Sequence, residues 1–404
     1  MKFKHSKKLS ILLLLAGSIS LLMACEKLLP GTRAEDALLD GPVEGLTNEQ
    51  NAQFLSGDIA FNNEVFTKQT GLGSLFVATS CGTCHAGDGK GHPFTTLVRF
   101  GQSDTVNGNR FLHMGGPQLQ NRAVPGFKPE QIPAGATHSS FMPPANTGLG
   151  FIDALPDATL LAMADPTDAD GDGISGRVNW IHPPAYSSLR PNSISHNGKY
   201  IGRFGKKAAT YDLLQQTASA YNQDMGITSA YEPNDTYTGQ PLDPEVTNQT
   251  VLNVVFYLKT LKVPIQRNQN DADVIAGKQV FINIGCGKCH TPSVTTGPSS
   301  IAALSNQTYF SYSDLLLHDM GNGLNDGYTE GTALPQEWRT PPLWGLGLSK
   351  QSQGGQYFLL HDGRATSIEQ AITLHGGEGM NSNTKFQQLT PAEKFKLIKF
   401  LESL

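Results

Sequence analysis

The sequence predicts a mainly α protein that contains one unit twice. The motif C-x-x-C-H occurs at residues 81–85 and again at 286–290. Long loops follow each copy, and each unit then ends in an amphipathic helical pattern. The chain has 404 residues, of which 43 are glycine, 24 are proline and only 16% are charged. This composition favours long loops over a packed scaffold.

The beginning of the chain predicts export and a lipid anchor. Residues 1–24 join a lysine-rich start to an apolar run that is short for a transmembrane helix, which is typical of a signal peptide. The run leads into Cys25 in a pattern that resembles the bacterial lipobox, so we expect a lipid on this cysteine. The alternative is an ordinary signal peptide with a chance cysteine. Residues 25–50 predict a tether, because large apolar residues are few and not periodic.

Charge and cysteine usage exclude several classes of protein. The formal net charge of −5 argues against a sequence-independent nucleic-acid binder, which carries a basic excess. Five cysteines are too few for a disulfide scaffold of this length. Together with the export signal, these features predict a lipoprotein of the bacterial cell envelope that faces the periplasm.

In an exported protein, C-x-x-C-H indicates a covalently attached c-type haem. The two thiols add to the two vinyl groups of the haem, and the adjoining histidine is placed beneath the iron. Two copies use every cysteine except the one predicted to carry lipid. The motifs therefore assign haem attachment to Cys81, Cys84, Cys286 and Cys289, and the proximal iron ligands to His85 and His290.

Three other interpretations of the cysteine pairs remain open. A thioredoxin-like redox pair needs a surrounding βαβ pattern, which the sequence lacks. A structural zinc site formed by all four thiolates leaves both histidines unexplained. A disulfide within each pair leaves them unexplained as well.

The terminal helices predict where the two domains end. Apolar residues recur with helical spacing over 251–261 and over 397–404. The last segment begins with Thr390, followed by proline and, three residues on, glutamate, which is a capping-box pattern. A motif, loops and a closing helix form the layout of a cytochrome c domain. We expect a first haem domain over 51–268, enlarged by an insertion, and a second over 269–404.

The second unit resembles the bacterial di-haem cytochrome c peroxidase and MauG superfamily. The first unit is similar to a narrower branch, the di-haem oxidoreductases described as peroxidases or thiol oxidoreductases. The matching segments of the second unit are 285–290, 314–321, 339–343, 358–363 and 367–372. Those of the first are 71–73, 81–85, 148–154, 168–179 and 203–205.

The resemblance implies an oxidoreductase that reduces hydrogen peroxide at the first haem with electrons that enter through the second. It implies a small electron-donor protein, such as a cytochrome or a cupredoxin, as partner. One alternative is a pure electron-transfer cytochrome with two six-coordinate irons. Another is oxidation of a thiol, an organic molecule or a protein by the haems.

The resemblance also implies further site residues. In the superfamily the distal ligand of the second haem lies fourteen residues after the histidine of an H-D-G segment. That segment is 361–363 in this chain, so His375 occupies the ligand position. A loop histidine at the surface is the alternative. Arg364 is expected to pair with a haem propionate, or else to form a surface ion pair. No ligand is assigned to the distal side of the first haem, where an open iron would bind peroxide. The histidines and methionine nearby are His92, His113, Met114 and His138, and the tryptophans considered as an aromatic bridge are Trp180, Trp338 and Trp344.

An acidic loop in the first unit predicts a cation site. Asp168, Asp170 and Asp172 alternate in D-x-D-x-D-G, and carboxylates on a glycine turn suit Ca²⁺. Position 12 of a standard EF-hand is glutamate, whereas this chain has Asn179. The alternative is a solvated acidic turn.

Overall fold

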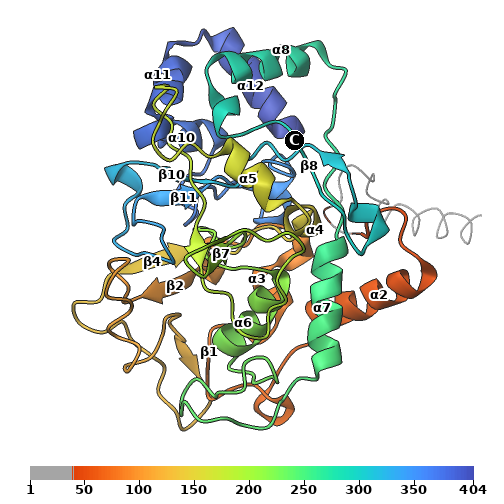
Figure 1. Ribbon diagram of the computed structural model, residues 1–404, viewed down its shortest axis with the longest axis vertical. Helices are drawn as coiled ribbons and strands as arrows, with labels where there is room; N and C mark the ends of the chain where they lie inside the picture. Colours follow the sequence, from red (N-terminus) through yellow and green to blue (C-terminus); the bar gives the residue numbers. More distant parts are fainter. Residues whose placement is uncertain (1–38, 40) are drawn as a thin grey trace, which may run out of the picture. The chain divides into compact units, whose positions relative to one another are not determined.

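The computed structural model describes residue 39 and residues 41–404. Helices are its longest elements, and they are joined by long irregular segments (Figure 1). The α-helices of the described residues are α2 (Asn48–Asn62), α3 (Cys81–Cys84), α4 (Leu149–Asp153), α5 (Asp157–Met163), α6 (Leu213–Met225), α7 (Asn248–Thr260), α8 (Ala272–Asn283), α9 (Ser349–Ser352), α10 (Ile368–Thr373), α11 (Met380–Gln388) and α12 (Pro391–Ser403).

Two crossed helix pairs repeat the same packing. Helix α2 crosses α7, and α8 crosses α12. At the first crossing, a Cβ atom built on Gly57 would lie 2.1 Å from the carbonyl oxygen of Asn253. At the second, a Cβ atom on Gly277 would lie 2.0 Å from that of Lys396. Because only glycine permits such close backbone approach, each unit brings the helix before its motif against its closing helix in the same way.

The helix boundaries follow local signals in the sequence. Helix α12 begins after the N-cap Thr390, and its capping box with Glu393 forms as predicted. Helix α7 is capped by Thr247, whose side chain accepts a hydrogen bond from the backbone N–H of Thr250. Val251, within α7, is fully buried, as its apolar stripe predicts.

The sheets are small and local. Four are two-stranded and antiparallel, and the fifth has the order β5-β7-β6. Strand β10 pairs with β11 so that His318 lies opposite Trp338. The strands of the described residues are β1 (Leu75–Phe76), β2 (Leu97–Phe100), β3 (Arg122–Ala123), β4 (His138–Phe141), β5 (Trp180–Ile181), β6 (Ser195–His196), β7 (Lys199–Ile201), β8 (Val294–Thr295), β9 (Thr308–Tyr309), β10 (Leu317–Asp319) and β11 (Glu337–Arg339).

Two hydrophobic cores lie behind the two motifs. The first surrounds the crossing of α2 and α7, and Cys81 packs against it. The second surrounds the crossing of α8 and α12, and Cys286 packs against it. Tyr309 and Trp344, which follow the predicted boundary at residue 268, nevertheless belong to the first core. The loops of the second unit thus contribute to the core of the first, and residues 39–404 form one compact unit.

The expected fold class is confirmed only in part. The structure is mixed, with dominant helices and several small sheets that the mainly α prediction omitted. The signal peptide, Cys25 and most of the predicted tether lie outside the described residues. The described end of that tether contacts the fold, because the N–H of Val43 donates to the carbonyl of Thr260. Within residues 39 and 41–404, no helix has both the length and the apolar character that a membrane span requires.

Candidate haem sites

The four motif cysteines are free thiols. Burial raises the pKa of Cys81, Cys84 and Cys286 to about 12, so these thiols are protonated at neutral pH. Redox-active and metal-binding cysteines need the opposite shift. Among the described residues, no three of the thiols come within 4.8 Å of one another. No disulfide joins the cysteines of either pair, so both thiols of each pair are available for haem attachment.

Three histidines share one orientation that suits iron binding. The Nδ1–H of His85 donates to the carbonyl of Pro144 over 3.0 Å, and that of His290 to the carbonyl of Tyr312 over 2.9 Å. The Nδ1–H of His375 donates to the carbonyl of Ala371 over 2.7 Å. The Nε2 atom of each ring has no hydrogen-bond partner among the described residues. Such bonds fix the tautomer and leave Nε2 as the ligand atom.

Burial keeps these three imidazoles neutral, which iron binding requires. Desolvation lowers the pKa of His85 and of His290 to about 4, and it also lowers that of His375. The pKa of His290 is lowered further by nearby His375. The structure therefore brings together the two predicted ligands of the second haem.

The second site uses a strained backbone to hold its proximal histidine. Tyr312 has a φ of 49°, in the left-handed region that non-glycine residues rarely adopt. This conformation presents its carbonyl to His290, while its ring packs between Phe281 and Phe400. Strain of this kind persists only where surrounding contacts hold it and is common at functional sites.

A buried network joins this motif to the loop of His375. His318 bridges Asp314, at 2.9 Å from its Nε2, and Glu378, at 2.6 Å from its Nδ1. Burial alone would lower the pKa of His318, but hydrogen bonds with Asp314, Cys289 and Glu378 outweigh it and raise the pKa to about 12. Glu378 also accepts hydrogen bonds from the N–H and hydroxyl of Ser175. His318 is thus a buried cation between two carboxylates, and it lies beside Cys289.

The first site has no matching second histidine. No histidine among the described residues acts on the pKa of His85. His113, Met114 and His138 are exposed. His92 is half-buried and stacks on Phe94 at 4.6 Å between ring centroids. The charged group that acts on His85 is instead Lys206.

The acidic loop is only partly arranged as predicted. Carboxylate oxygens of Asp168 and Asp170 lie within 4.8 Å of each other and of Asp165, which the sequence analysis did not select. Asp172 points elsewhere and pairs with Lys288 of the second motif at 2.6 Å. Calcium binding stays a prediction. The loop does link the first unit to the second haem motif, and a pocket of about 370 Å³ lies between them.

Arg364 lies in an ion pair. Its Nε donates to Asp362 over 2.6 Å, its Nη1 donates to the carbonyl of Gly323, and its side chain is 39% exposed. The pairing with a propionate stays a prediction. Arg364 lines a pocket of about 510 Å³ together with His138, Asp326 and His361.

The imidazole of His361 stacks on Trp338, with 3.6 Å between ring centroids and 9° between planes. Burial lowers the pKa of His361 to about 3 and keeps it neutral. Trp344 belongs to the first hydrophobic core and Trp180 packs against it. The packing of both tryptophans is therefore that of ordinary core residues.

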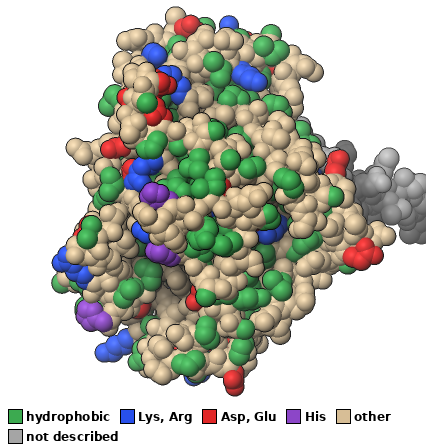
Figure 2. All heavy atoms as spheres, viewed as in Figure 1, with side chains coloured by type: hydrophobic (Ala, Val, Ile, Leu, Met, Phe, Trp, Pro, Cys, Tyr) green, Lys and Arg blue, Asp and Glu red, His purple; other side chains and the backbone are tan. Residues whose placement is uncertain are grey.

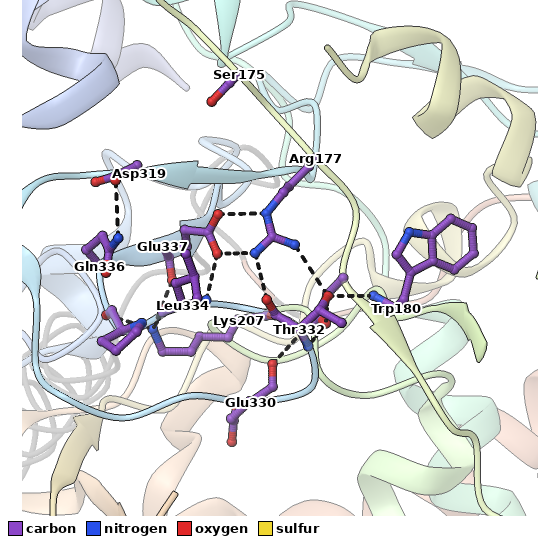
Figure 3. A network of polar contacts seen from close by, with 12 residues as sticks. Ser175, Arg177, Trp180, Lys207, Asp319, Glu330, Thr332, Leu334, Gln336 and Glu337 are labelled. Carbon is purple, nitrogen blue, oxygen red and sulfur yellow. Dashed lines mark hydrogen bonds and ion pairs between the residues drawn. The ribbon is translucent and has the colours of Figure 1, made fainter. Parts of the chain in front are cut away.

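An ion-pair network holds β11 in place (Figure 3). The guanidinium of Arg177 contacts both carboxylate oxygens of Glu337 and donates to the carbonyl of Thr332 over 2.6 Å. The hydroxyl of Thr332 accepts from the backbone N–H of Trp180 over 3.1 Å. Because β11 also carries Trp338, this network sets the position of the indole.

Some buried polar side-chain atoms have no hydrogen-bond partner, and they test whether the residues of the sites fit a haem. The hydroxyl of Tyr221, whose pKa is raised by burial and by nearby Cys81, has no hydrogen-bond partner, nor does that of Tyr312 in the second site. Nη1 of Arg339 is also buried and unpaired. Because buried polar atoms are nearly always satisfied, a polar cofactor with carboxylates fits this donor set. The residues present therefore fit two c-type haems.

Several residues of the site were missed by the sequence analysis. Asp224 acts on both thiols of the first motif, and burial raises its pKa to about 6. Glu378 follows His375 by three residues, and Lys206 follows a segment that supported the resemblance. No periodicity marks these residues, because only their tertiary neighbours distinguish them.

The visible face in Figure 2 mixes acidic and basic side chains, without a large area of one sign. It therefore does not by itself indicate the charge of a partner.

Comparisons with known proteins define the family. A comparison with curated proteins gives no match. Among solved structures, the chain is similar to hydrazine synthase of Kuenenia stuttgartiensis pressurized with xenon, with 13% identity, a TM-score of 0.38, and coverage of 93% of this chain and 98% of that one. A family model described as "Di-haem oxidoreductase, putative peroxidase" matches residues 139–404, which include the second motif but not the first. The chain therefore belongs to this family of di-haem oxidoreductases.

Proposed function

We propose that the protein is a peroxidase that reduces hydrogen peroxide at the first haem site and takes up electrons at the second. The family is that of an oxidoreductase. The observation that carries the finer proposal is the difference between the sites. His290 has a second histidine, His375, within electrostatic reach, whereas His85 has none among the described residues.

The residues of the chain divide the work between the two sites. The cysteine pairs hold the haems, whose irons, when bound, supply the electron-transfer and O–O cleavage chemistry. Hydrogen bonds from Nδ1 fix His85, His290 and His375 with Nε2 available. With haems bound, His290 and His375 would together hold the second iron and exclude substrate, whereas His85 alone would hold the first and leave room for a small molecule.

The test uses the holoprotein with both haems reduced. Reduction of one H₂O₂ to two H₂O takes two electrons and two protons, so one equivalent of peroxide should oxidise both haems. Stopped-flow absorption measures this ratio and its rate. We expect C81A/C84A to lose the peroxide reaction. Two low-spin haems that do not react with peroxide would instead indicate the electron-transfer alternative.

The pocket beside Trp338 favours a second candidate, oxidation of a small organic substrate. Its volume of about 510 Å³ and its lining by His138, Asp326 and Arg364 suit a polar molecule. Peroxide consumption that rises with an added reductant, and falls in H138A, would support this candidate. Consumption that depends only on an electron-donor protein would exclude it.

We further propose the cellular setting that the sequence predicts. Residues 1–24 and Cys25 support export and lipid attachment at the periplasmic face of the envelope. A small cytochrome or cupredoxin is the proposed electron donor. Mass spectrometry of the mature N-terminus tests the anchor, because a lipid-modified Cys25 would be the first residue.

A further inference from the structure

Two consecutive lysines in the turn after Phe204 have opposite environments. The ammonium group of Lys207 donates to the carbonyls of Leu334, Pro335 and Glu337, at 2.9 to 3.0 Å. Figure 3 shows this side chain reaching toward that loop. The ammonium group of Lys206 has no hydrogen bond or ion pair among the described residues. Since the lysines are neighbours in sequence, tertiary structure alone makes this difference.

Lys206 belongs to a group of three cations, which we call the cation cluster. Its other members are Lys90 and Arg339, and both act on Lys206 electrostatically. Burial, reinforced by these two charges, lowers the pKa of Lys206 to about 7, and burial lowers that of Lys90 to about 8. Arg339 donates from Nε to the carbonyl of Gly205 over 3.0 Å, but its Nη1 is buried without a partner.

Nearby carboxylates do not neutralise the cluster. Asp362 is the acidic group that acts on Lys206, and it is already paired with Arg364 at 2.6 Å. Asp314, the acidic group that acts on Arg339, is already paired with His318 at 2.9 Å, and neither Lys90 nor Arg339 has an ion pair among the described residues. Desolvated like charges without a counter-ion are unfavourable, so the cluster is suited to an anion.

The position of the cluster indicates which anion it binds. Lys90 follows His85 by five residues, and a Cβ atom built on the adjoining Gly91 would lie 2.9 Å from the carbonyl oxygen of Cys84, which places the cluster near the first motif. A haem carries two propionates on the edge opposite the vinyl groups that react with the cysteines. Where the fold buries these carboxylates, they need cationic or hydrogen-bonding partners.

We propose that Lys90, Lys206 and Arg339 bind the propionate carboxylates of the haem attached through Cys81 and Cys84. This rests on the haem assignment of the first motif and not on the substrate of the enzyme. It differs from the sequence prediction, which gave the propionate contact to Arg364.

Redox titration of the holoprotein, followed by absorption and EPR, tests the proposal. Positive charge near a haem favours the reduced state, so K206Q and R339Q should each lower the midpoint potential of the first haem. The first haem is identified by its absence in C81A/C84A. K206R keeps the charge and should restore the potential, and K68Q, an exposed lysine, should leave it unchanged.

Three results would overturn the proposal. The first is a wild-type potential in both K206Q and R339Q. The second is a shift confined to the second haem, or one seen in R364Q alone. The third is a saturable response of the wild-type potential to acetate, which would mean that the cluster binds free carboxylates. If K206Q does not retain haem, K90Q removes one charge of the same cluster from a different segment and gives the same test.

Peroxide turnover is measured separately, on the wild-type protein and on the same variants. Absence of a peroxide reaction in the wild-type protein, with the predicted shift in potential in the variants, would contradict the proposed function and leave the propionate assignment intact. A normal reaction with no shift would do the reverse.

Discussion

The two C-x-x-C-H motifs share their chemistry but differ in how the fold surrounds them. His85 donates to the carbonyl of Pro144, an ordinary loop residue, whereas His290 donates to the strained Tyr312. The second motif lies near His375 and a network of buried carboxylates, while the first lies near Lys206, which forms no ion pair with any residue that the structure describes. The same motif therefore occurs in two different environments, and the difference comes mostly from residues distant along the chain.

This contrast separates attachment from reactivity. Attachment needs only the pentapeptide, because both thiols and the histidine lie within five residues. Under the proposed function, reactivity depends on whether a second residue holds the iron, and we propose that His375 does so at the second site. The following variants test the contrast, from the largest expected effect to the smallest.

His375→Ala should abolish the asymmetry between the sites. Removing a second axial ligand converts a low-spin haem into a high-spin one, so we expect the low-spin EPR signal of the second haem to disappear. H138A, an exposed histidine, serves as the control and should keep it. An unchanged low-spin second haem in H375A would refute the assignment of this ligand.

His318→Gln should destabilise the second site. The substitution leaves Asp314 and Glu378 buried without their shared cation, which typically costs about 3–5 kcal/mol of unfolding free energy. Urea or thermal unfolding of the holoprotein measures the loss, with the exposed H196Q as control. A change within about 0.5 kcal/mol would show that the network contributes little.

The same network predicts a pH dependence. The pKa of His318 in the folded protein, about 12, lies above the usual histidine value of 6.5. Its stabilisation is therefore complete below pH 6.5 and decreases as the pH rises toward the folded value. Wild-type stability should fall between pH 7 and pH 10, and the fall should be smaller in H318Q. Parallel pH profiles for the two proteins would contradict this prediction.

Gly57→Ala and Gly277→Ala compare the two helix crossings. Each added methyl group meets a backbone carbonyl at about 2 Å, and overpacking of this kind costs roughly 1–3 kcal/mol. Both variants should lower the melting temperature by similar amounts. G323A adds a methyl group with no atom within 4 Å and is the control. Loss at only one crossing would show that the units do not repeat the same packing.

Lys288→Gln should have the smallest effect. The pair with Asp172 is partly exposed, at 47% and 28% of the two side chains, and such pairs contribute about 0–1 kcal/mol. The first motif has Thr83 at the equivalent position, so the pair is specific to the second. The loss should vanish in high salt and should be the same in D172N. A loss that salt does not change would indicate a structural role for the acidic loop.

The sequence by itself determined the elements whose information is local. The two motifs, the capping box at Thr390 and the apolar stripe of α7 each lie within a short segment, where spacing and periodicity carry the prediction. The resemblance added the family, and it pointed to His375 through a spacing of fourteen residues.

Only the tertiary structure decided which groups surround each motif. Asp172 follows the acidic pattern of its loop, yet it turns to Lys288, and Arg364 pairs with its neighbour Asp362. Lys206 and Lys207 are adjacent lysines, but one is satisfied by carbonyls of a distant loop and the other is not. The physical reason is that burial, charge and hydrogen bonding depend on distances in space, and segments far apart in the chain set those distances.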